Sequence, residues 1–560
     1  MDIKVNENET IKAESNFLRG TLQQSIRDEL TGSLSPADAQ ISKFHGFYEQ
    51  DDRDNRQQRQ GSFLEPDYSF MLRARLPGGV CTPAQWLAID GISQRLGNGS
   101  IRLTTRQTFQ YHGILKRNLK PLIQEINASL IDSIGGCGDI NRNVMCNPNP
   151  LQSELHAEVY AWARKISEQL KPRSRAYHEI WLDGEKQTQA DEEPVYGNTY
   201  LPRKFKIAVA VPPSNDVDIY TNDLGFIAIQ KQGKLTGFNV LAGGGMGTTH
   251  GDRSTFPRLA DELGFIALED VLKVAEAVVT VQRDEGNRIS RRHARLKYSI
   301  EKLGIHNFRQ LVEQRAGISF QTPHKVTFKH QGDRFGWTQS TDKRWNLTLF
   351  IENGRITDHH KAPIKTGLGK IAAVHQGDFR ITPNQNLIIA GIPAEQKQSI
   401  LELATQYGLI DEKISLLRLN SIACVAFPSC PQAMAEAERY FPELLTKFEL
   451  ILNKYGLSTL DLVIRMTGCP NGCARPFVAE IALVGKGPGR YNLMLGGDGH
   501  GQRLNKLYRE NLNEEGILKV MDELLEKFAT LRENDERLSD FVIRQGIISA
   551  VVNPAVDFHA

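Results

Sequence analysis

Two stretches of the chain share one pattern of apolar and polar positions. The first runs from Gly99 to Ile114 and the second from Gly377 to Ile392, an offset of 278 residues. In each, a short apolar segment, a polar turn and a second apolar segment predict a pair of strands. Identical residues recur at matching places: Arg102 and Arg380, Thr104 and Thr382, Gln107 and Gln385, Gly113 and Gly391.

The same offset joins positions outside these strands. It places Cys146 on Cys424, and Ala157-Glu158 on Ala435-Glu436. A period this long excludes a solenoid. We therefore predict two fused copies of one large α/β unit, related by a pseudo-twofold axis, with a central cleft suited to a large cofactor.

A helix is expected after the cysteine of each copy. In the first copy the apolar residues with helical spacing are Leu155, Val159, Trp162, Ile166 and Leu170. In the second copy Pro431 follows Cys430, at a position that suits the first turn of a helix.

The first 65 residues have little apolar periodicity. Polar runs at 51–54 and 56–60 indicate either a solvated linker or an arm. The aromatic residues of Phe44–Tyr48 could anchor such an arm to its own core or to a partner.

Composition excludes several classes of protein. Of 560 residues, 24% are charged and 40% hydrophobic, and the formal net charge is +2, which favours a soluble globular protein over a general polyanion binder. The longest apolar runs, Phe205–Val211 and Leu387–Ile392, fall short of the ~20 residues that span a bilayer. The N-terminus resembles neither a secretory signal nor a transit peptide. Seven cysteines, few and odd in number, favour a reducing cytosol.

Four of the seven cysteines are clustered in sequence. Cys424 and Cys430 form a C-x5-C pair, and Cys469 and Cys473 a C-x3-C pair. Four thiolates can hold a [4Fe–4S] cluster, which this spacing favours, or a structural zinc ion, for which five intervening residues are unusual. Buried unligated thiols are a third alternative. We interpret the remaining three cysteines as core thiols: Cys81, Cys137 and Cys146.

Two lysines alternate with other residues in Leu201–Ile207. Strand periodicity puts Lys204 and Lys206 on one face, opposite Arg203 and Phe205. Like charges on one face repel unless an anion lies between them. The segment by itself is also typical of a solvated sheet edge, and from the segment alone this second interpretation is favoured.

Two further segments are less specific. The basic run Arg288–Lys297 fits a solvated helix face, a clamp for cofactor carboxylates or, with less support, a nucleic-acid patch. The glycine-rich Gly243–Gly247 lacks the dinucleotide and P-loop patterns, so we predict close backbone approach to a flat cofactor or an ordinary loop. No segment predicts a site for NADPH or flavin, so electrons are expected from another protein.

The cysteine motifs, Ala423–Pro431 and Thr467–Cys473, strongly resemble those of the sulfite and nitrite reductases that pair a [4Fe–4S] cluster with sirohaem. The likeness covers nearly the whole chain, through Glu14–Thr21, Phe44–Gly46, Arg75–Gly79, Arg106–Gln110, Asn141–Asn143, Leu201–Lys206 and Asn384–Asn386. Ala474 departs from the glycine expected after the last cysteine, which puts only the tightness of that turn in doubt.

The resemblance implies an α+β or α/β fold of three domains. Two pseudo-twofold-related ferredoxin-like half-domains would accompany α/β cofactor-binding units. The expected division is an N-terminal arm (1–65), a first half-domain (66–145), a sirohaem- and substrate-binding domain (146–334), a second half-domain (335–410) and a cluster- and sirohaem-binding domain (411–560).

The resemblance also implies roles for individual residues. The cluster would be held by Cys424, Cys430, Cys469 and Cys473, with Cys473 bridging it to the sirohaem iron. The substrate anion would be surrounded by Arg73, Arg142, Lys204 and Lys206. Sirohaem contacts are expected from Arg102, Arg106, Gln107, His112, Asn471 and Cys473. In the second repeat Arg106 becomes Asn384 and His112 becomes Ala390, which fits either a scaffold copy or a drifted surface.

The function implied is the six-electron reduction of sulfite to sulfide. A flavoprotein subunit that oxidises NADPH would be the electron donor, so NADPH, FAD and FMN are expected on the partner only. The alternatives are a ferredoxin-dependent sulfite reductase, a sirohaem nitrite reductase that makes ammonia, and a zinc-stapled scaffold protein without redox chemistry.

Overall fold

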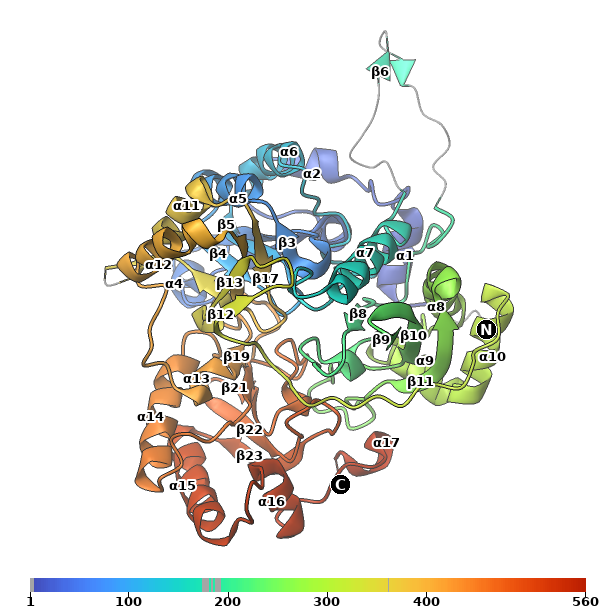
Figure 1. Cartoon of the computed structure of the whole chain (residues 1–560). Coiled ribbons are helices and arrows are strands. Elements are labelled where there is room, and N and C mark those ends of the chain that lie inside the picture. The colour runs from blue at the N-terminus through green and yellow to red at the C-terminus, as the bar shows by residue number, and fades with distance from the viewer. Residues whose placement is uncertain (1–4, 174–180, 183–184, 187–192, 361, 560) are drawn as a thin grey trace.

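The fold comprises two pairs of related units. The computed structural model describes residues 5–173, 181–182, 185–186, 193–360 and 362–559. Figure 1 shows the blue and gold segments side by side in the upper part of the molecule, and the green and orange-red segments below them. Chain portions far apart in sequence therefore form each layer.

The upper pair is built on two five-stranded sheets. The first sheet has the order β1 (Phe47–Asp51), β2 (Tyr68–Arg73), β5 (Phe109–Ile114), β4 (Ile101–Leu103), β14 (Arg355–Ile356). The second has the order β12 (Gly336–Gln339), β13 (Trp345–Leu349), β18 (Leu387–Ile392), β17 (Asp378–Ile381), β3 (Val80–Cys81). The two repeats thus exchange strands, because β14 completes the first sheet and β3 completes the second.

Helices of both repeats cover one shared core. They are α5 (Pro83–Leu96), α6 (Leu119–Ala128), α11 (Ile364–Val374) and α12 (Lys397–Gln406). The core is continuous across the repeats. At its centre the ring of Trp86 stacks on that of Phe379, with centroids 4.7 Å apart.

The predicted repeat is confirmed in detail. Strand β18 and helix α12 have the bounds of β5 and α6 moved by 278 residues. Arg102 pairs with Gln110 across the first sheet, and Arg380 pairs with Ile388 at the equivalent place. Gln107 and Gln385 both have positive φ, 53° and 70°, in the turns between the paired strands.

Two glycines permit the strand exchange. Gly79 precedes β3 with φ +74°, and Gly354 precedes β14 with φ +75°. A Cβ at Gly79 would collide with the carbonyl oxygen of Ile381, and one at Gly354 with that of Leu103. Each exchanged strand can therefore approach its host strand only where glycine supplies both the space and the left-handed backbone.

The lower pair has a second common plan. One sheet has the order β11 (Asp261–Ala267), β10 (Lys234–Ala242), β9 (Leu224–Lys231), β8 (Ile207–Ala210). The other has the order β19 (Ser421–Ala423), β20 (Ile464–Thr467), β21 (Ile481–Gly487), β22 (Arg490–Leu495), β23 (Lys506–Leu512). In both, a parallel pair leads into an antiparallel meander.

The remaining elements flank these sheets. Around the first lie α7 (Glu154–Gln169), α8 (Val271–Glu285), α9 (Leu296–Leu303) and α10 (Ile305–Ala316). Around the second lie α13 (Leu416–Leu419), α14 (Phe441–Lys454), α15 (Glu514–Leu531), α16 (Leu538–Arg544) and α17 (Pro554–Asp557). Two small hairpins are β6 (Trp181–Leu182) with β7 (Glu185–Lys186), and β15 (Asp358–His359) with β16 (Ala362–Pro363). None of the described helices is both long and apolar enough to cross a bilayer.

The helix predictions had mixed outcomes. The helix predicted after Cys146 is confirmed as α7, which begins after the capping side chain of Ser153 and buries Val159 and Ile166. A helix start at Pro431 is wrong, since α14 begins at Phe441. The backbone N–H groups of Met434 and Ala435 instead donate to the Gly468 carbonyl, at 2.8 and 3.0 Å.

The absence of a helix start at Pro431 also limits how far the repeat extends. Ala157-Glu158 lies inside α7, whereas Ala435-Glu436 lies in the loop before α14, so this match is not a structural equivalence. The match of Cys146 with Cys424 holds. Met145 bridges in parallel to Ala208 of β8, and Ala423 pairs in parallel with Met466 of β20, so each cysteine follows an equivalent strand.

The N-terminal segment wraps its own core. It contains α1 (Glu7–Glu14), α2 (Leu22–Arg27), α3 (Pro36–Ile41) and α4 (Arg56–Gly61), while β1 joins the first sheet. Phe44 is fully buried. The buried ammonium of Lys12 contacts Glu9 at 2.6 Å and the Leu201 carbonyl at 2.7 Å. The interpretation as a solvated linker is therefore wrong.

All four units meet at a buried ion cluster centred on Asp218. This carboxylate from the β8–β9 connection pairs with Arg465 of β20 at 2.7 Å and with Arg475. The Arg475 guanidinium also donates to the carbonyls of Thr105 and Pro383, at 3.1 and 3.0 Å. Because Thr105 and Pro383 belong to the two repeats of the upper layer, one arginine links all four units.

Replacing Asp218 with Asn is expected to lower the free energy of unfolding by about 3–5 kcal/mol, because two arginines would remain buried without their counter-charge. A urea titration followed by circular dichroism measures the difference between this variant and the unaltered chain.

Asp216→Asn is the matched control. Asp216 is also buried, and burial together with Asp333 raises its pKa to about 7. A carboxyl whose pKa is raised on folding costs stability as pH rises from its unfolded value, ~4, toward 7. Asp216→Asn should therefore gain stability relative to the unaltered chain between pH 5 and 8. A loss as large as that of Asp218→Asn would contradict the role given to the Asp218 pairs.

Candidate active site

The four clustered cysteines lie on two loops that meet at one sheet edge. Cys424 directly follows β19, and Cys469 closely follows β20. Because these strands are parallel neighbours, their carboxyl ends emerge together. The Gly468 N–H points to the Cys424 sulfur at 3.3 Å, and the Asn471 side-chain amide to the Cys469 sulfur at 3.6 Å.

The electrostatics also place the four thiols near one another. Burial, reinforced by the neighbouring cysteines, raises the pKa of Cys424 well above its usual value and that of Cys469 to about 12. Burial followed by Cys473 raises the pKa of Cys430. Thiolates in this setting need the positive charge of bound metal to persist. Cys473 differs from the others because its side chain is exposed.

The donor set fits an iron–sulfur cluster, since it offers four thiols with N–H groups directed at sulfur. Within the described ranges, no group of three or more His, Cys, Asp or Glu side chains is arranged to hold a metal ion. A multi-iron cluster holds its thiolates farther apart than a single ion does. The four cysteines stay our predicted cluster ligands.

Basic side chains gather on the Cys473 side of these loops. Burial and then Arg203 lower the pKa of Lys204 to about 7. Burial and then Lys204 lower the pKa of Lys206 well below its usual value. The Cys473 thiol acts on both lysines in the opposite sense, so both lie within electrostatic reach of it. Phe205 between them is buried, as the alternation predicted, although the segment before β8 is not a regular strand and Phe205 forms only an isolated bridge to Asn141.

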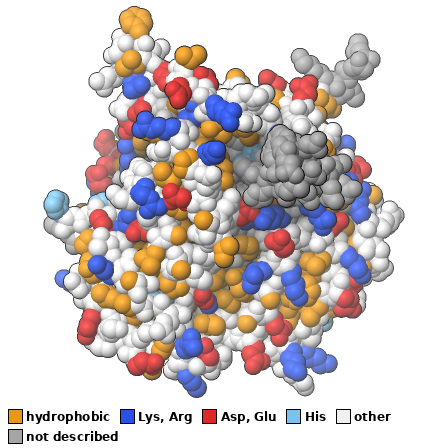
Figure 2. Space-filling view, turned by 90° about the horizontal axis from the view of Figure 1, so that it is seen from above, with side chains coloured by type: hydrophobic (Ala, Val, Ile, Leu, Met, Phe, Trp, Pro, Cys, Tyr) orange, Lys and Arg blue, Asp and Glu red, His pale blue; other side chains and the backbone are white. Residues whose placement is uncertain are grey.

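The solvated-edge interpretation does not describe these lysines. Arg106, Arg142 and Arg295 also depress the pKa of one or both. Figure 2 shows Lys, Arg, Asp and Glu mixed over the face seen from above, without a dominant patch of one sign. The cations near Cys473 are thus a local concentration of positive charge in a chain of nearly neutral net charge.

Two of the predicted anion-binding arginines lie side by side. The Arg73 and Arg142 guanidinium groups both donate to the Gly136 carbonyl, at 3.4 and 3.0 Å. Arg73 also contacts the Cys137 sulfur at 3.3 Å. The structure thus brings Arg73 and Arg142 together from β2 and from the loop between α6 and α7.

Backbone contacts fix the orientation of the other cations. The Arg106 guanidinium donates to the carbonyls of Asn143 and Ile207, at 2.7 and 2.9 Å. The Lys206 N–H donates to the Asp223 carboxylate at 2.9 Å, and the same carboxylate accepts two bonds from Arg295, at 3.0 and 2.8 Å. Asp223 therefore holds two cations beside each other.

Arg102 and Gln107 each hold a neighbouring loop. Arg102 pairs with Glu438 at 2.8 Å and donates to the Ala423 carbonyl at 3.0 Å, next to Cys424. Gln107 donates to the Ile381 carbonyl at 3.1 Å, and its oxygen accepts from the Cys146 N–H at 3.0 Å. Their predicted cofactor contacts stay predictions.

His112 is buried on β5. Burial, followed by Arg355 and Arg102, lowers its pKa well below the usual value, so the imidazole is neutral. Among the described residues neither ring nitrogen has a hydrogen-bond partner. Its predicted cofactor contact, like those of Arg106 and Asn471, stays a prediction.

The basic run Arg288–Lys297 is neither a solvated face nor a nucleic-acid patch. Arg291 pairs with Asp139 at 2.7 Å, and Arg295 with Asp223. The buried Lys297 ammonium donates to the carbonyls of Gly245 and Gly247, at 3.2 and 2.8 Å. The basic run therefore holds the glycine-rich loop Gly243–Gly247 in place.

That loop approaches protein backbone. A Cβ at Gly244 would collide with the carbonyl oxygens of Tyr220 and Asn222. The Thr248 N–H donates to the Pro470 carbonyl at 2.9 Å, within the C-x3-C turn. The described contacts thus seat the loop on the turn that carries Cys469 and Cys473, while its predicted approach to a flat cofactor stays a prediction.

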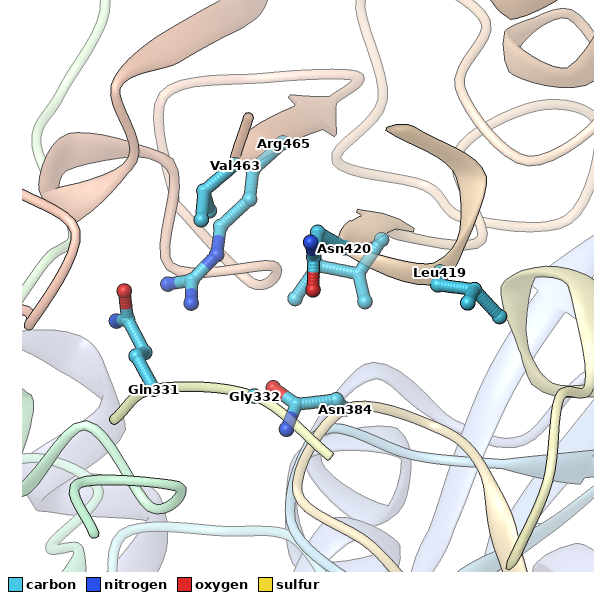
Figure 3. A pocket seen from close by; sticks show the side chains of 8 residues that line it. Gln331, Gly332, Asn384, Leu419, Asn420, Val463 and Arg465 are labelled. Carbon is cyan, nitrogen blue, oxygen red and sulfur yellow. The ribbon is translucent and has the colours of Figure 1, made fainter. Parts of the chain in front are cut away.

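A small cavity lies next to the Asp218 cluster. Figure 3 shows the Arg465 guanidinium pointing into it, with Gln331 and Asn384 opposite. Its volume of about 10 Å³ suits one water molecule. The cavity is distinct from the cationic region beside Cys473, because it is not lined by Arg73, Arg142, Lys204 or Lys206.

Sequence reasoning missed three residues that organise the site: Asp223, Arg295 and Arg475. Arg295 was flagged only as part of the basic run, and Arg475 follows the last cysteine by two positions. Their importance arises from partners distant in sequence, such as the 257 residues between Arg475 and Asp218.

Comparison with known proteins identifies the family. The model of the nitrite/sulfite reductase ferredoxin-like half domain matches residues 64–129 and 338–407, one on each strand-exchanged repeat. The model of the nitrite and sulphite reductase 4Fe-4S domain matches residues 161–320, which contain Lys204, Lys206 and Arg295 but none of the seven cysteines.

Full-length relatives agree with these matches. A protein of Thiocapsa roseopersicina is 61% identical over 560 residues, and one of Shewanella loihica is 58% identical over 562, with 100% of both chains covered in each case. Both are described as sulfite reductase [NADPH] hemoprotein beta-component.

A solved structure shares the fold. The NirA protein of Mycobacterium tuberculosis superposes with a TM-score of 0.79 over 96% of each chain, at 24% identity. With full-length relatives this similar and both repeats matched by the half-domain model, the chain belongs to the family of the sulfite reductase hemoprotein beta-components, within the nitrite and sulfite reductases.

Proposed function

We propose that the chain is the haemoprotein component of an assimilatory sulfite reductase, which reduces sulfite to sulfide with six electrons. The observation that carries the proposal is the set of cations beside the exposed Cys473, in a chain 61% identical to a named sulfite reductase component. A small dianion whose oxygens leave as water needs such fixed positive charge.

The proposal includes two cofactors. Cys424, Cys430, Cys469 and Cys473 would hold a [4Fe–4S] cluster, and Cys473 would also hold sirohaem, whose carboxylates we expect Arg106 to contact. When bound, these groups would transfer electrons from the donor to the substrate. Every other contribution to catalysis comes from the side chains of the chain itself.

These side chains have separate roles in catalysis. Arg73 and Arg142 offer fixed forks of donors, which orient the oxygens of the anion. Lys204, with a pKa of about 7, can give up a proton as an oxygen leaves. The Asp223 carboxylate keeps the backbone of Lys206 and the Arg295 guanidinium in place.

The electron donor in this proposal is a flavoprotein partner that oxidises NADPH and carries FAD and FMN. The description of the relatives as a beta-component supports a second subunit. The sparse, odd cysteine content supports a cytosolic location.

The ratio of kcat/KM for sulfite over nitrite, with a reduced viologen as donor, tests the function. We expect a ratio well above one, because specificity is a difference in transition-state stabilisation. A ratio well below one would make the chain a nitrite reductase.

Lys204→Met and Lys206→Met are each expected to lower sulfite turnover by well over tenfold and to leave the absorption spectrum unchanged, because anion binding and proton supply are lost while the cofactors stay. Lys234→Met, on the exposed end of β10, is the control and should keep its activity. Unaltered turnover in both test variants would remove these lysines from the mechanism.

Cys473→Ser is expected to lose both the sirohaem absorption and the iron and labile sulfide of the cluster, because one thiolate would hold both groups. Metal analysis and the visible spectrum measure this. Cys146→Ala, which removes a buried thiol outside the group of four, is the control and should keep both cofactors. A Cys473→Ser protein with a normal spectrum would show that the thiolate is not shared.

A further inference from the structure

The N-terminal arm contacts the loop that carries two of the four cysteines. Just after β1, the Arg53 N–H donates to the Pro428 carbonyl at 3.4 Å. The next residue, Asp54, pairs with Arg439 at 2.7 Å. Both partners lie in the segment 424–440 between β19 and α14, so the arm covers the outer side of this cysteine loop.

The Arg53 side chain makes the closest of these contacts. Its guanidinium donates to the Ala433 carbonyl at 2.6 Å and to the carbonyl of Cys430 itself at 3.3 Å. It also lies over the Phe427 ring, 4.4 Å from the centroid. One planar fork therefore holds three positions of the loop.

The loop depends on such contacts because it has no regular structure. Between β19 and α14 the described residues form neither helix nor strand. Its inner side is fastened by the bonds from Met434 and Ala435 to Gly468. Arg53 fastens its outer side, on the turn that aims Cys430.

The charge of Arg53 is not cancelled by an ion pair. No carboxylate of the described residues lies within ion-pair distance of its guanidinium, whereas Arg56, three residues further on, is paired with Asp51 at 2.7 Å. The hydrogen bond to the Cys430 carbonyl, at 3.3 Å, brings this positive charge next to the backbone of a predicted cluster ligand.

We propose that Arg53 is a positioning residue that fixes Cys430 as a cluster ligand and raises the reduction potential of the cluster through its uncompensated charge. The inference rests on the proposed function, because it requires a [4Fe–4S] cluster on the four cysteines. A fixed cation close to a thiolate ligand favours the reduced, more negative form of a cluster, since hydrogen bonds and net charge set its potential.

The test is a redox titration of the purified protein followed by electron paramagnetic resonance. Arg53→Gln should shift the equilibrium toward the oxidised cluster by about tenfold, which is about 59 mV for one electron. Arg53→Lys, which keeps the charge but not the fork, should stay closer to the unaltered protein. Arg56→Gln is the matched control in the same arm and should leave the potential unchanged.

Two results would overturn this inference without affecting the proposed function. One is an unaltered reduction potential in Arg53→Gln. The other is loss of the cluster from both Arg53→Lys and Arg53→Gln, which would deny a role to the charge. Loss of the cluster from Arg53→Gln only would support it. If the unaltered protein itself carried no cluster, the proposed function would fail and this inference with it.

Discussion

The buried pairs of Asp218 with Arg465 and Arg475 are the constraint on which the arrangement of the four units depends. Three charges are removed from water there, and the two ion pairs form only when the two lower units are docked. Arg475 reaches both upper repeats through Thr105 and Pro383. Its own backbone belongs to the turn that follows Cys473. The ion pairs of Asp218 therefore also fix the position of the exposed Cys473 thiol.

The candidate site likewise combines residues from several units. The cysteines follow two neighbouring parallel strands of one sheet, and the cations come from the first upper repeat and from the unit of β8 to β11. Lys204 and Lys206 belong to the segment before β8, while Arg73 belongs to β2. Mutual repulsion among these cations is offset in part by Asp223 and by the Cys473 thiol. A cationic site of this density can exist in a nearly neutral chain because its counter-charges are buried beside it.

The sequence pattern predicted the features that depend on residues close together in the chain. The repeat with its two strands, helix α7 and the alternation around Phe205 follow from residues a few positions apart. What it could not predict depends on distant partners. The ion pair of Arg102 with Glu438 joins residues 336 positions apart. Pro431 suits the start of a helix, but the loop around it is held by Gly468 instead. No local pattern contains either partner.

The exchange of β3 and β14 makes each upper sheet depend on both repeats. A single copy of the repeat would leave its own exchanged strand, after Gly79 or Gly354, unpaired, and its sheet would lack the edge strand of the other copy. The two repeats are therefore one cooperative folding unit, because unfolding of either would remove an edge strand from the other.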